Sequence, residues 1–390
     1  MNRKGYIALF LAIFLLLGGC GNGVRGVETA SPEVTGSESP QDEQTHEIGD
    51  YAYAFAKYRP EDVVMTINDI EITWREYFYR VSSMVRTIEE NFGEITAWDE
   101  PGEVDPTVTM QEWVEREVYA DLKLEAAIRK QAGDMGVKLS ETNEKELNDG
   151  IEAEFEQIAM NGYDPEVVLE SLYLTKETYS RLQSVGYLYN NLFVKMFGVS
   201  GANCSDQESE SHIEENNLIY SKHILLLTTK KDEETQSDIA MSEEELAEVR
   251  ALAEDILAQL DAAEDKDAAF NDLMAEYTED TGYANFKDGY VFGTNSSIVP
   301  EYRTTMEELL PGEYSGIVES QFGYHIIMRM EITPETVIEK AADGEVLTVR
   351  YEAAMANYDK LVDAWGKEAV VELSDEFKDL TFAAIFEHTH

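Results

Sequence analysis

Cysteine, histidine and basic residues are scarce in this chain of 390 residues. It has 2 Cys and 6 His, and its 30 Lys and Arg stand against 79 Asp and Glu, a formal net charge of −49. Two cysteines cannot build a disulfide framework, and no Cys-x-x-Cys or His-Glu-x-x-His spacing predicts a metal site. Nucleic acid is an unfavourable partner for so acidic a chain, because phosphate binding requires clustered cations. We therefore expect no metal, no cofactor and no nucleic acid.

The first twenty residues have the pattern of a signal peptide. Arg3 and Lys4 supply positive charge, YIALFLAIFLLL supplies a short apolar core, and LGGC at 17–20 ends on Cys20. This ending resembles the lipobox of bacterial lipoproteins, which implies that Cys20 carries a diacylglycerol and becomes the new N-terminus. An ordinary cleaved signal and an uncleaved membrane anchor are the alternatives, although a membrane span needs about 20 apolar residues. The lipobox predicts a protein held by lipid at the extracytoplasmic face of the cell membrane.

The next stretches differ sharply in composition. Residues 21–50 are rich in Gly, Ser, Pro and acidic residues, so they cannot bury enough apolar surface to fold. This composition predicts a flexible tether. From 73 to 198 apolar residues recur at helical spacing, and capping boxes at Thr73 and Thr109 predict two helix starts. Residues 200–216 are polar and acidic and predict a hinge.

Beyond the hinge, strands alternate with helices. LIYSKHILLL at 218–227 and FGYHIIMRM at 322–330 predict buried strands, and each carries one of the scarce histidines, His223 and His325. Helices are predicted after Ser242, over AAFNDLMAEY and after Pro300. A histidine on an apolar strand is most often a satisfied core residue, and this alternative stands beside any catalytic role.

One further helix is predicted over 346–366. Its apolar face has nothing nearby in sequence to cover it, so we expect it to pack on the helices before residue 200. The face consists of Leu347, Tyr351, Met355, Tyr358 and Leu361.

Three segments carry a family resemblance. SKHILLL, FNDLMAEYTED and IVPEYRTTMEELLPGEYSGIVESQFGYHII resemble, in this order, the opening strand, the next helix and turn, and the closing half of parvulin-type peptidyl-prolyl isomerases. With the lipobox, tether and flanking helices, the chain resembles foldase lipoproteins of the PrsA kind. This implies an α+β fold in which a parvulin-like α/β domain is inserted in a mainly helical chaperone domain. The implied parts are 1–20 (signal peptide), 21–50 (tether), 51–215 (helical chaperone segment), 216–332 (isomerase domain) and 333–390 (C-terminal helical segment packing on the chaperone domain).

The resemblance also implies a site. It places His223 and His325 side by side beneath a proline pocket, Asp280 beside the substrate carbonyl, and Ser320 at the end of their hydrogen-bond network. It assigns four residues to the pocket lining: Tyr290, Ile298, Tyr302 and Phe322. Ile298 stands where the family usually has Met and Tyr302 where it has Phe, and a Tyr hydroxyl in an apolar pocket requires a partner.

The implied function is cis/trans isomerisation of X–Pro bonds in unfolded or partly folded secreted polypeptides, together with holdase activity. Ile298 and Tyr302 favour an alternative, a non-catalytic chaperone with a degenerate parvulin domain. A solute-binding lipoprotein is a further alternative, but it needs two α/β lobes and the long helical run argues against it. The loop 228–241 lacks a net positive cluster for phosphate, so phospho-specific recognition is not expected. A homodimer and the role of Cys204 stay open.

Overall fold

The computed structural model describes residues 50–387 except 103, 233–234, 236 and 341–345. The described residues form two units. The first takes its residues from the chain up to Lys195 and again from Asp359 onward, and the second is Met196–Tyr358. Helices and strands are both present, so the predicted α+β class is confirmed. Cys20, the rest of the signal peptide and the tether up to residue 49 lie outside the described residues.

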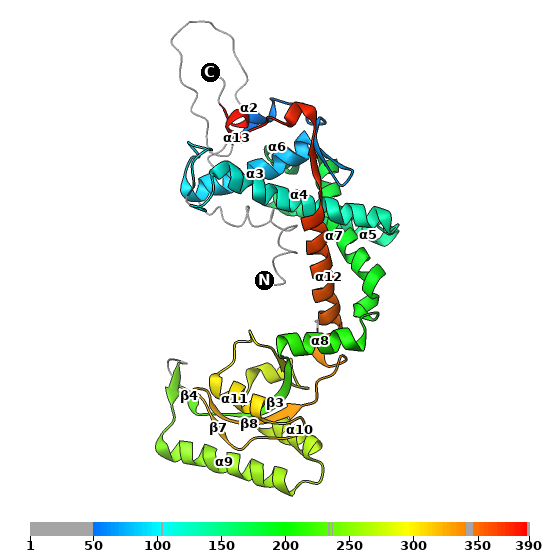
Figure 1. The fold of residues 1–390 in the computed structure, drawn as a ribbon. Helices are drawn as coiled ribbons and strands as arrows, with labels where there is room; N and C mark the ends of the chain where they lie inside the picture. Colours follow the sequence, from blue (N-terminus) through cyan, green and yellow to red (C-terminus); the bar gives the residue numbers. More distant parts are fainter. Residues whose placement is uncertain (1–49, 103, 233–234, 236, 341–345, 388–390) are drawn as a thin grey trace. The chain divides into compact units, whose positions relative to one another are not determined.

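Long helices make up most of the first unit (Figure 1). The capping boxes predicted at Thr73 and Thr109 are confirmed, because each hydroxyl accepts the N–H of a glutamate three residues later and that carboxylate binds back. Ser140 and Asp164 cap two further helices. No helix among the described residues combines the length and the apolar composition needed to cross a membrane. The helices of this unit are α2 (Ala52–Phe55), α3 (Trp74–Phe92), α4 (Met110–Asp134), α5 (Glu141–Met160), α6 (Pro165–Ser171), α7 (Lys176–Phe197, which ends in the second unit) and α13 (Phe382–Ile385).

A small antiparallel sheet joins the two chain segments of the first unit. Its order is β11 (Val371–Leu373), β1 (Val63–Ile67), β2 (Ile70–Thr73). Asn68 and Asp69 form the turn between β1 and β2, and both have the positive φ that a tight two-residue hairpin requires. On its other edge β1 pairs with β11, so that Met65 lies opposite Leu373. Strand β11 was not predicted from the sequence.

Aromatic side chains fill the core of this unit. Trp74, Phe78 and Phe377 are at most 1% exposed. The Trp74 ring centroid lies 5.1 Å from that of Phe78 and 6.1 Å from that of Phe377. Because Phe377 belongs to the short helix η3 (Asp375–Phe377), which follows β11, the C-terminal segment shares one core with α3. Large buried rings dominate the energy of such a core.

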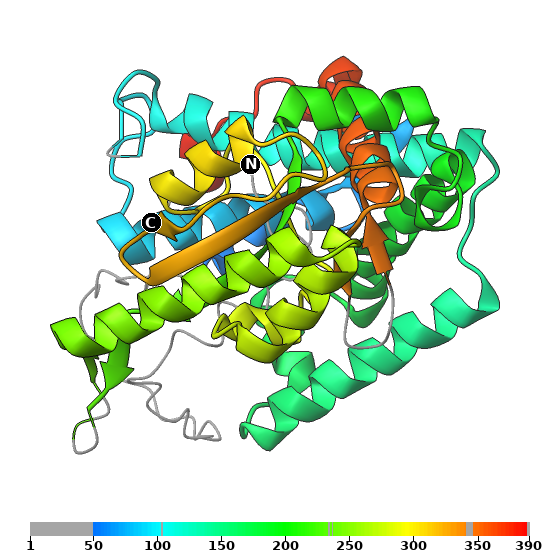
Figure 2. The ribbon, with the colours of Figure 1, turned by 90° about the horizontal axis from the view of Figure 1, so that it is seen from below.

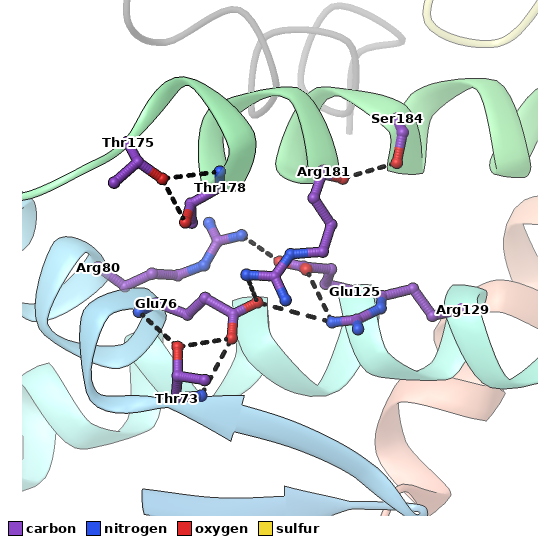
Figure 3. A network of polar contacts seen from close by, with 9 residues as sticks. All are labelled: Thr73, Glu76, Arg80, Glu125, Arg129, Thr175, Thr178, Arg181 and Ser184. Carbon is purple, nitrogen blue, oxygen red and sulfur yellow. Dashed lines mark hydrogen bonds and ion pairs between the residues drawn. The ribbon is translucent and has the colours of Figure 1, made fainter. Parts of the chain in front are cut away.

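A buried network of charged side chains links α3, α4 and α7 (Figure 3). Glu76 of α3 is 2% exposed, and its Oε1 lies 3.7 Å from Arg129 of α4 and 3.0 Å from Arg181 of α7. Glu125 of α4 is equally buried and pairs with Arg80 and Arg129. Buried carboxylates require such partners to offset their lost hydration. The network therefore constrains how the three helices pack.

A four-stranded antiparallel sheet forms the centre of the second unit. Its order is β6 (Tyr290–Phe292), β3 (Ile219–Leu227), β8 (Gly323–Met330), β7 (Val318–Glu319). Helix α11 (Pro300–Glu308) lies on one face, and α9 (Glu243–Ala262) and α10 (Lys266–Tyr277) cover the other (Figures 1 and 2). Burial on both faces explains the apolar runs at 224–227 in β3 and 326–328 in β8. The two predicted histidine-bearing strands are confirmed, as are the helices predicted after Ser242 and Pro300.

Further elements complete the second unit, and two predictions are wrong here. Residues 200–216 form helices instead of a hinge, because Ser205 and Glu208 build a capping box that starts α8. The loop predicted at 228–241 contains a short hairpin, in which Lys231 lies opposite Asp238. The remaining elements are η1 (Val199–Gly201), α8 (Asp206–Asn216), β4 (Thr229–Lys231), β5 (Asp238–Ala240), η2 (Thr281–Ala284), β9 (Val337–Lys340), β10 (Val346–Thr348) and α12 (Val349–Glu368, which ends in the first unit).

The C-terminal segment also differs from its prediction. Its described residues beyond 333 contain three strands as well as helices. Helix α12 begins at Val349, because Leu347 pairs instead with Glu339 of β9. Of the five residues predicted for its apolar face only Tyr358 is fully buried, and Leu361 is 36% exposed. The buried positions on α12 are Val349, Ala353, Ala354, Tyr358 and Val362.

Candidate active site

The sheet of the second unit places His223 and His325 on the same face. In the antiparallel register of β3 and β8, His223 lies opposite Ile327 and His325 lies opposite Leu225. The two histidines are therefore diagonal neighbours on adjacent strands, a position from which side chains on one face can meet. Their rings are 15° from parallel with centroids 5.4 Å apart, and their Nδ1 atoms are 3.2 Å apart.

A continuous line of hydrogen bonds runs through the two rings. His223 Nε2 lies 3.0 Å from Oδ2 of Asp280, and His325 Nε2 lies 2.7 Å from Oγ of Ser320. The same Oγ accepts the backbone N–H of Phe322 at 3.1 Å. The structure thus brings together all four residues that the sequence reading proposed as catalytic, from β3, from β8, from the turn after α10 and from the turn between β7 and β8.

Protonation gives this line a direction. A carboxylate only accepts hydrogen bonds, so His223 donates its Nε2–H to Asp280. Burial, reinforced by the neighbouring His223, lowers the pKa of His325 to about 4, although the charge of Asp280 opposes this. His325 is therefore neutral at pH 7. We assign its proton to Nδ1, which donates to Nδ1 of His223, while its Nε2 accepts the Ser320 hydroxyl. Every donor then meets an acceptor.

Asp280 is the charged end of the line. Burial alone would raise its pKa, but hydrogen bonds from His223, from the Tyr290 hydroxyl and from the Gly282 N–H (2.9 Å) hold that pKa well below its usual range. Its carboxylate is therefore ionised at neutral pH. Burial and the bond to Asp280 raise the pKa of Tyr290, so the Tyr290 hydroxyl stays protonated and donates.

Tyr302 covers the site from α11. It is 4% exposed, and its ring stands edge-on to both imidazoles, with centroids 5.2 Å from His223 and 5.7 Å from His325. Burial raises the pKa of Tyr302, and its hydroxyl lies 3.1 Å from Oγ of Ser221. Ser221 is thus the partner that the buried hydroxyl requires. Sequence reasoning missed Ser221, although alternation along β3 places it on the same face as His223.

Two residues proposed to line the pocket differ in their surroundings. Ile298 packs in an apolar cluster that includes Tyr302, Met306 and Ile327. Phe322 is 51% exposed, and its backbone N–H donates to Oγ of Ser320. An exposed ring beside ordered polar groups is available for contact with a substrate.

Tyr290, also proposed for the pocket, has a different place. Its hydroxyl belongs to the polar line through Asp280, while its ring lies against Phe286 (4.9 Å between centroids) and Phe292 (5.8 Å). Phe292 in turn meets Tyr302 at 5.7 Å. Phe292 lies in the sequence run YVFG, two residues after Tyr290, but it was not predicted as a site residue.

The arrangement offers a fixed negative charge, ordered polar groups behind it and aromatic rings beside it. Asp280 provides the charge, and Tyr302 and Phe292 provide the rings. Within the described part of the chain, no group of three or more His, Cys, Asp or Glu side chains is placed to hold a metal ion.

Comparison with known families bears directly on this site. Residues 223–331 match the Rotamase family model, described as a PPIC-type PPIASE domain. This segment is a PPIC-type peptidyl-prolyl isomerase domain. It contains all four residues of the hydrogen-bonded line from Asp280 to Ser320, and it confirms the predicted parvulin-type resemblance.

Curated relatives extend the similarity beyond the isomerase domain. The chain is 28% identical to Foldase protein PrsA of Halalkalibacterium halodurans over 50% of this chain and 51% of that protein, about half the length of the relative. It is 22% identical to Foldase protein PrsA of Clostridium perfringens over 80% of this chain and 86% of that protein. Chaperone SurA of Pseudomonas aeruginosa is 28% identical over 40% of this chain and 34% of that protein. These matches confirm the predicted PrsA-like character. Among solved structures, PrsA from Bacillus subtilis aligns with a TM-score of 0.28 at 19% identity, over 72% of this chain and 96% of that one.

Proposed function

We propose that this chain is a foldase that isomerises X–Pro bonds in unfolded secreted polypeptides and also holds such polypeptides in solution. One observation carries the proposal: a hydrogen-bonded line of Asp280, His223, His325 and Ser320 within a PPIC-type domain. The words foldase and chaperone in the names of the relatives support it. The helical first unit would supply the holdase surface.

Electrostatics at Asp280 can accelerate the reaction. Amide resonance sets a barrier of roughly 18–20 kcal/mol to rotation about the bond. The carbonyl oxygen carries partial negative charge in the planar amide and loses part of it as the bond twists. A carboxylate held near that oxygen destabilises the planar form more than the twisted one, which lowers the barrier without a covalent step. The polar line behind Asp280 would keep its charge fixed in place.

A prolyl isomerisation assay on the purified chain tests this proposal. Short X–Pro peptides should isomerise faster with the protein than without it. A phosphoserine–proline peptide should gain no advantage, because Lys230 pairs with Glu245 and Lys231 with Asp238. A folded chain that gives no rate above background would refute the enzyme proposal.

A non-catalytic chaperone is the second candidate. Ile298 and Tyr302 favour it, since a β-branched residue is stiffer than the Met that the family usually has at the first position. This candidate predicts suppressed aggregation of an unfolded client with no isomerase activity. If activity is present but weak, Ile298→Met should raise it, whereas a rate unchanged by that substitution would show that the stiff side chain is not limiting.

We also propose a lipid anchor at Cys20 on the extracytoplasmic face of the cell membrane. The sequence LGGC at 17–20 supports it. Two or more acyl chains on one residue would hold the protein firmly, since a single chain gives only marginal binding. Cys20→Ala should release the protein from the membrane fraction. Retention of this variant after an alkaline wash would favour a helical anchor instead.

A further inference from the structure

Part of one edge of β3 has no neighbouring strand in the described structure. Strand β6 pairs with Ile219, Tyr220 and Ser221, whereas β3 continues to Leu227. Backbone groups on such an edge need other partners when they are buried. The missing partners come from the turn that follows α10.

Two residues of that turn bind the free edge. Thr278 Oγ1 accepts the N–H of Leu225 at 3.1 Å, and the N–H of Glu279 donates to the Leu225 carbonyl at 2.8 Å. The Glu279 carboxylate then accepts the N–H of Leu227 at 2.7 Å. The turn therefore lies along β3 as a short substitute strand. Asp280 is the next residue of the turn, which places its carboxylate against His223 of β3.

A separate contact reaches Asp280 from β6. The Tyr290 hydroxyl donates to Oδ2, the same oxygen that binds His223. A Cβ at position 282 would lie 2.4 Å from the Tyr290 hydroxyl, so Gly282 leaves the space through which this ring approaches. Gly282 also donates its N–H to Oδ1 of Asp280 at 2.9 Å. Each carboxylate oxygen thus has a donor set by local geometry.

We propose that Thr278, Glu279 and Tyr290 are positioning residues that hold the Asp280 carboxylate against His223. Thr278 and Glu279 act through the backbone of the turn, and Tyr290 acts through its hydroxyl. The inference rests on the proposed isomerase function, which it deepens. A purely structural role would instead lower stability and leave the ionisation of the site unchanged.

Tyr290→Phe isolates the hydroxyl. The titratable groups that face Asp280 are His223, His325, Tyr290 and Tyr302. Removing one donor from the carboxylate favours its protonated form and so raises the pKa of Asp280. Loss of a hydrogen bond to a charged group predicts a fall in kcat/KM of about tenfold at neutral pH.

Thr278 allows an equally conservative pair of variants. Thr278→Val keeps the shape of the side chain and removes the acceptor of the Leu225 N–H, so kcat/KM should fall. Thr278→Ser keeps the oxygen and should restore the wild-type rate. Tyr314→Phe is the matched control for Tyr290→Phe, because it removes a Tyr–Asp hydrogen bond (2.6 Å to Asp261) elsewhere in the same unit.

The experiment combines kinetics with ¹⁵N-histidine NMR on the full chain, whose 6 His give few signals to assign. In Tyr290→Phe, kcat/KM should fall and the His223 Nε2 signal at neutral pH should shift, because that nitrogen donates to the same carboxylate oxygen that Tyr290 holds. The Tyr314→Phe control should match the wild type in both. A Tyr290→Phe chain with unchanged kinetics and an unchanged His223 signal would overturn the inference. Should the wild type lack isomerase activity, the proposed function fails, and the His223 Nε2 signal alone then decides whether Tyr290 positions Asp280.

Discussion

His223 and His325 face each other through Nδ1 atoms only 3.2 Å apart. One ring must offer a lone pair to the proton of the other, so two imidazolium ions cannot share this contact. Burial determines that His325 stays neutral. An imidazole has one nitrogen on each side of its ring and can accept at one while donating at the other. The two histidines therefore connect Asp280 to Ser320 through one continuous line of hydrogen bonds across the sheet.

Stability should depend on pH through His325. Its pKa is about 4 in the folded protein against an ordinary 6.5, so the unfolded chain binds the extra proton first as pH falls. The stability from the neutral ring is complete above about pH 6.5 and is lost progressively toward pH 4. Between pH 7 and pH 5 the wild type should lose about 2 kcal/mol more than His325→Gln.

Urea unfolding of both chains at the two pH values measures this difference. The surface carboxylates are common to both chains, so their contribution cancels. Asp280 titrates below this pH range, because its folded pKa is lowered. Parallel losses in the wild type and in His325→Gln would show that the ring is not held neutral.

The two ends of the line should differ in their effect on catalysis. Asp280→Asn keeps the size and the hydrogen-bond acceptor but removes the charge, and kcat/KM should fall on the order of 100-fold. Ser320→Ala removes one neutral hydrogen bond at the far end, so kcat/KM should fall only a few-fold. Asp255→Asn on exposed α9 is the control for general loss of charge and should leave the rate unchanged. Equal losses at Asp280 and Ser320 would contradict the electrostatic role of the carboxylate.

Much of this site was predicted from the sequence because its four polar residues lie in the segments that resemble parvulin-type isomerases. His223 and His325 sit on strands whose alternation fixes their faces, and the quoted motifs carried Asp280 and Ser320. The resemblance assigns Tyr290 to the pocket, but sequence spacing does not give the direction of a long side chain, so its hydrogen bond to Asp280 was not predicted. Ser221 was missed since its role exists only once Tyr302 from α11 is packed over it.

The fold shows the same division between local and distant causes. Capping boxes such as that at Thr73 are local, and they located helix starts correctly. Strand β11 has only three residues, and it forms because β1, roughly 300 residues earlier, offers an edge to pair with. The polar, acidic composition of 200–216 predicts a hinge, whereas Ser205 and Glu208 supply the capping box that starts α8. Pairing partners so distant leave little trace in local sequence.

Glu76 should be far more important for stability than its local motif suggests. Glu76→Gln preserves a capping acceptor for the Thr73 N–H but removes the charge that faces Arg129 and Arg181. Breaking a buried ion pair predicts a loss of about 3 kcal/mol. Glu112 occupies the same capping position in α4 but is exposed, so Glu112→Gln should cost less than about 0.5 kcal/mol. Urea unfolding followed by helical circular dichroism compares the two, and equal costs would mean that the ion pairs contribute nothing.

Lys222 provides a test of which partner in a buried pair matters. It is 1% exposed, with Nζ 2.5 Å from Asp267 and 2.7 Å from Asn271, whereas the Asp267 side chain is 54% exposed. Lys222→Met leaves Asp267 to water and keeps the apolar stem, so it should cost less than about 1.5 kcal/mol.

Asp267→Ala should cost more, about 3 kcal/mol, because it leaves a buried ammonium with fewer acceptors. The double variant should be no less stable than Asp267→Ala alone, since the stranded charge is then absent. Unfolding midpoints of the three chains give the comparison. A larger loss in Lys222→Met than in Asp267→Ala would show that the charge itself stabilises the fold.

The C-terminal segment should be necessary for the first unit to fold. A chain that ends at residue 332 lacks β11, so one edge of β1 loses its partner, and it lacks Phe377, so Trp74 loses a packed ring. Exposed edges and aromatic surface promote aggregation, and this chain should melt at lower temperature or precipitate.

Deleting 217–332 instead, with a short Gly/Ser linker, should leave a folded helical protein that still suppresses aggregation of an unfolded client. In that deletion Arg350 keeps its bonds to Asp206 and to the Cys204 carbonyl, which already hold the flanking segments together. Thermal melts of the helical signal decide between the two variants, and a truncated chain as stable as the full one would show that residues beyond 332 are not part of the first unit.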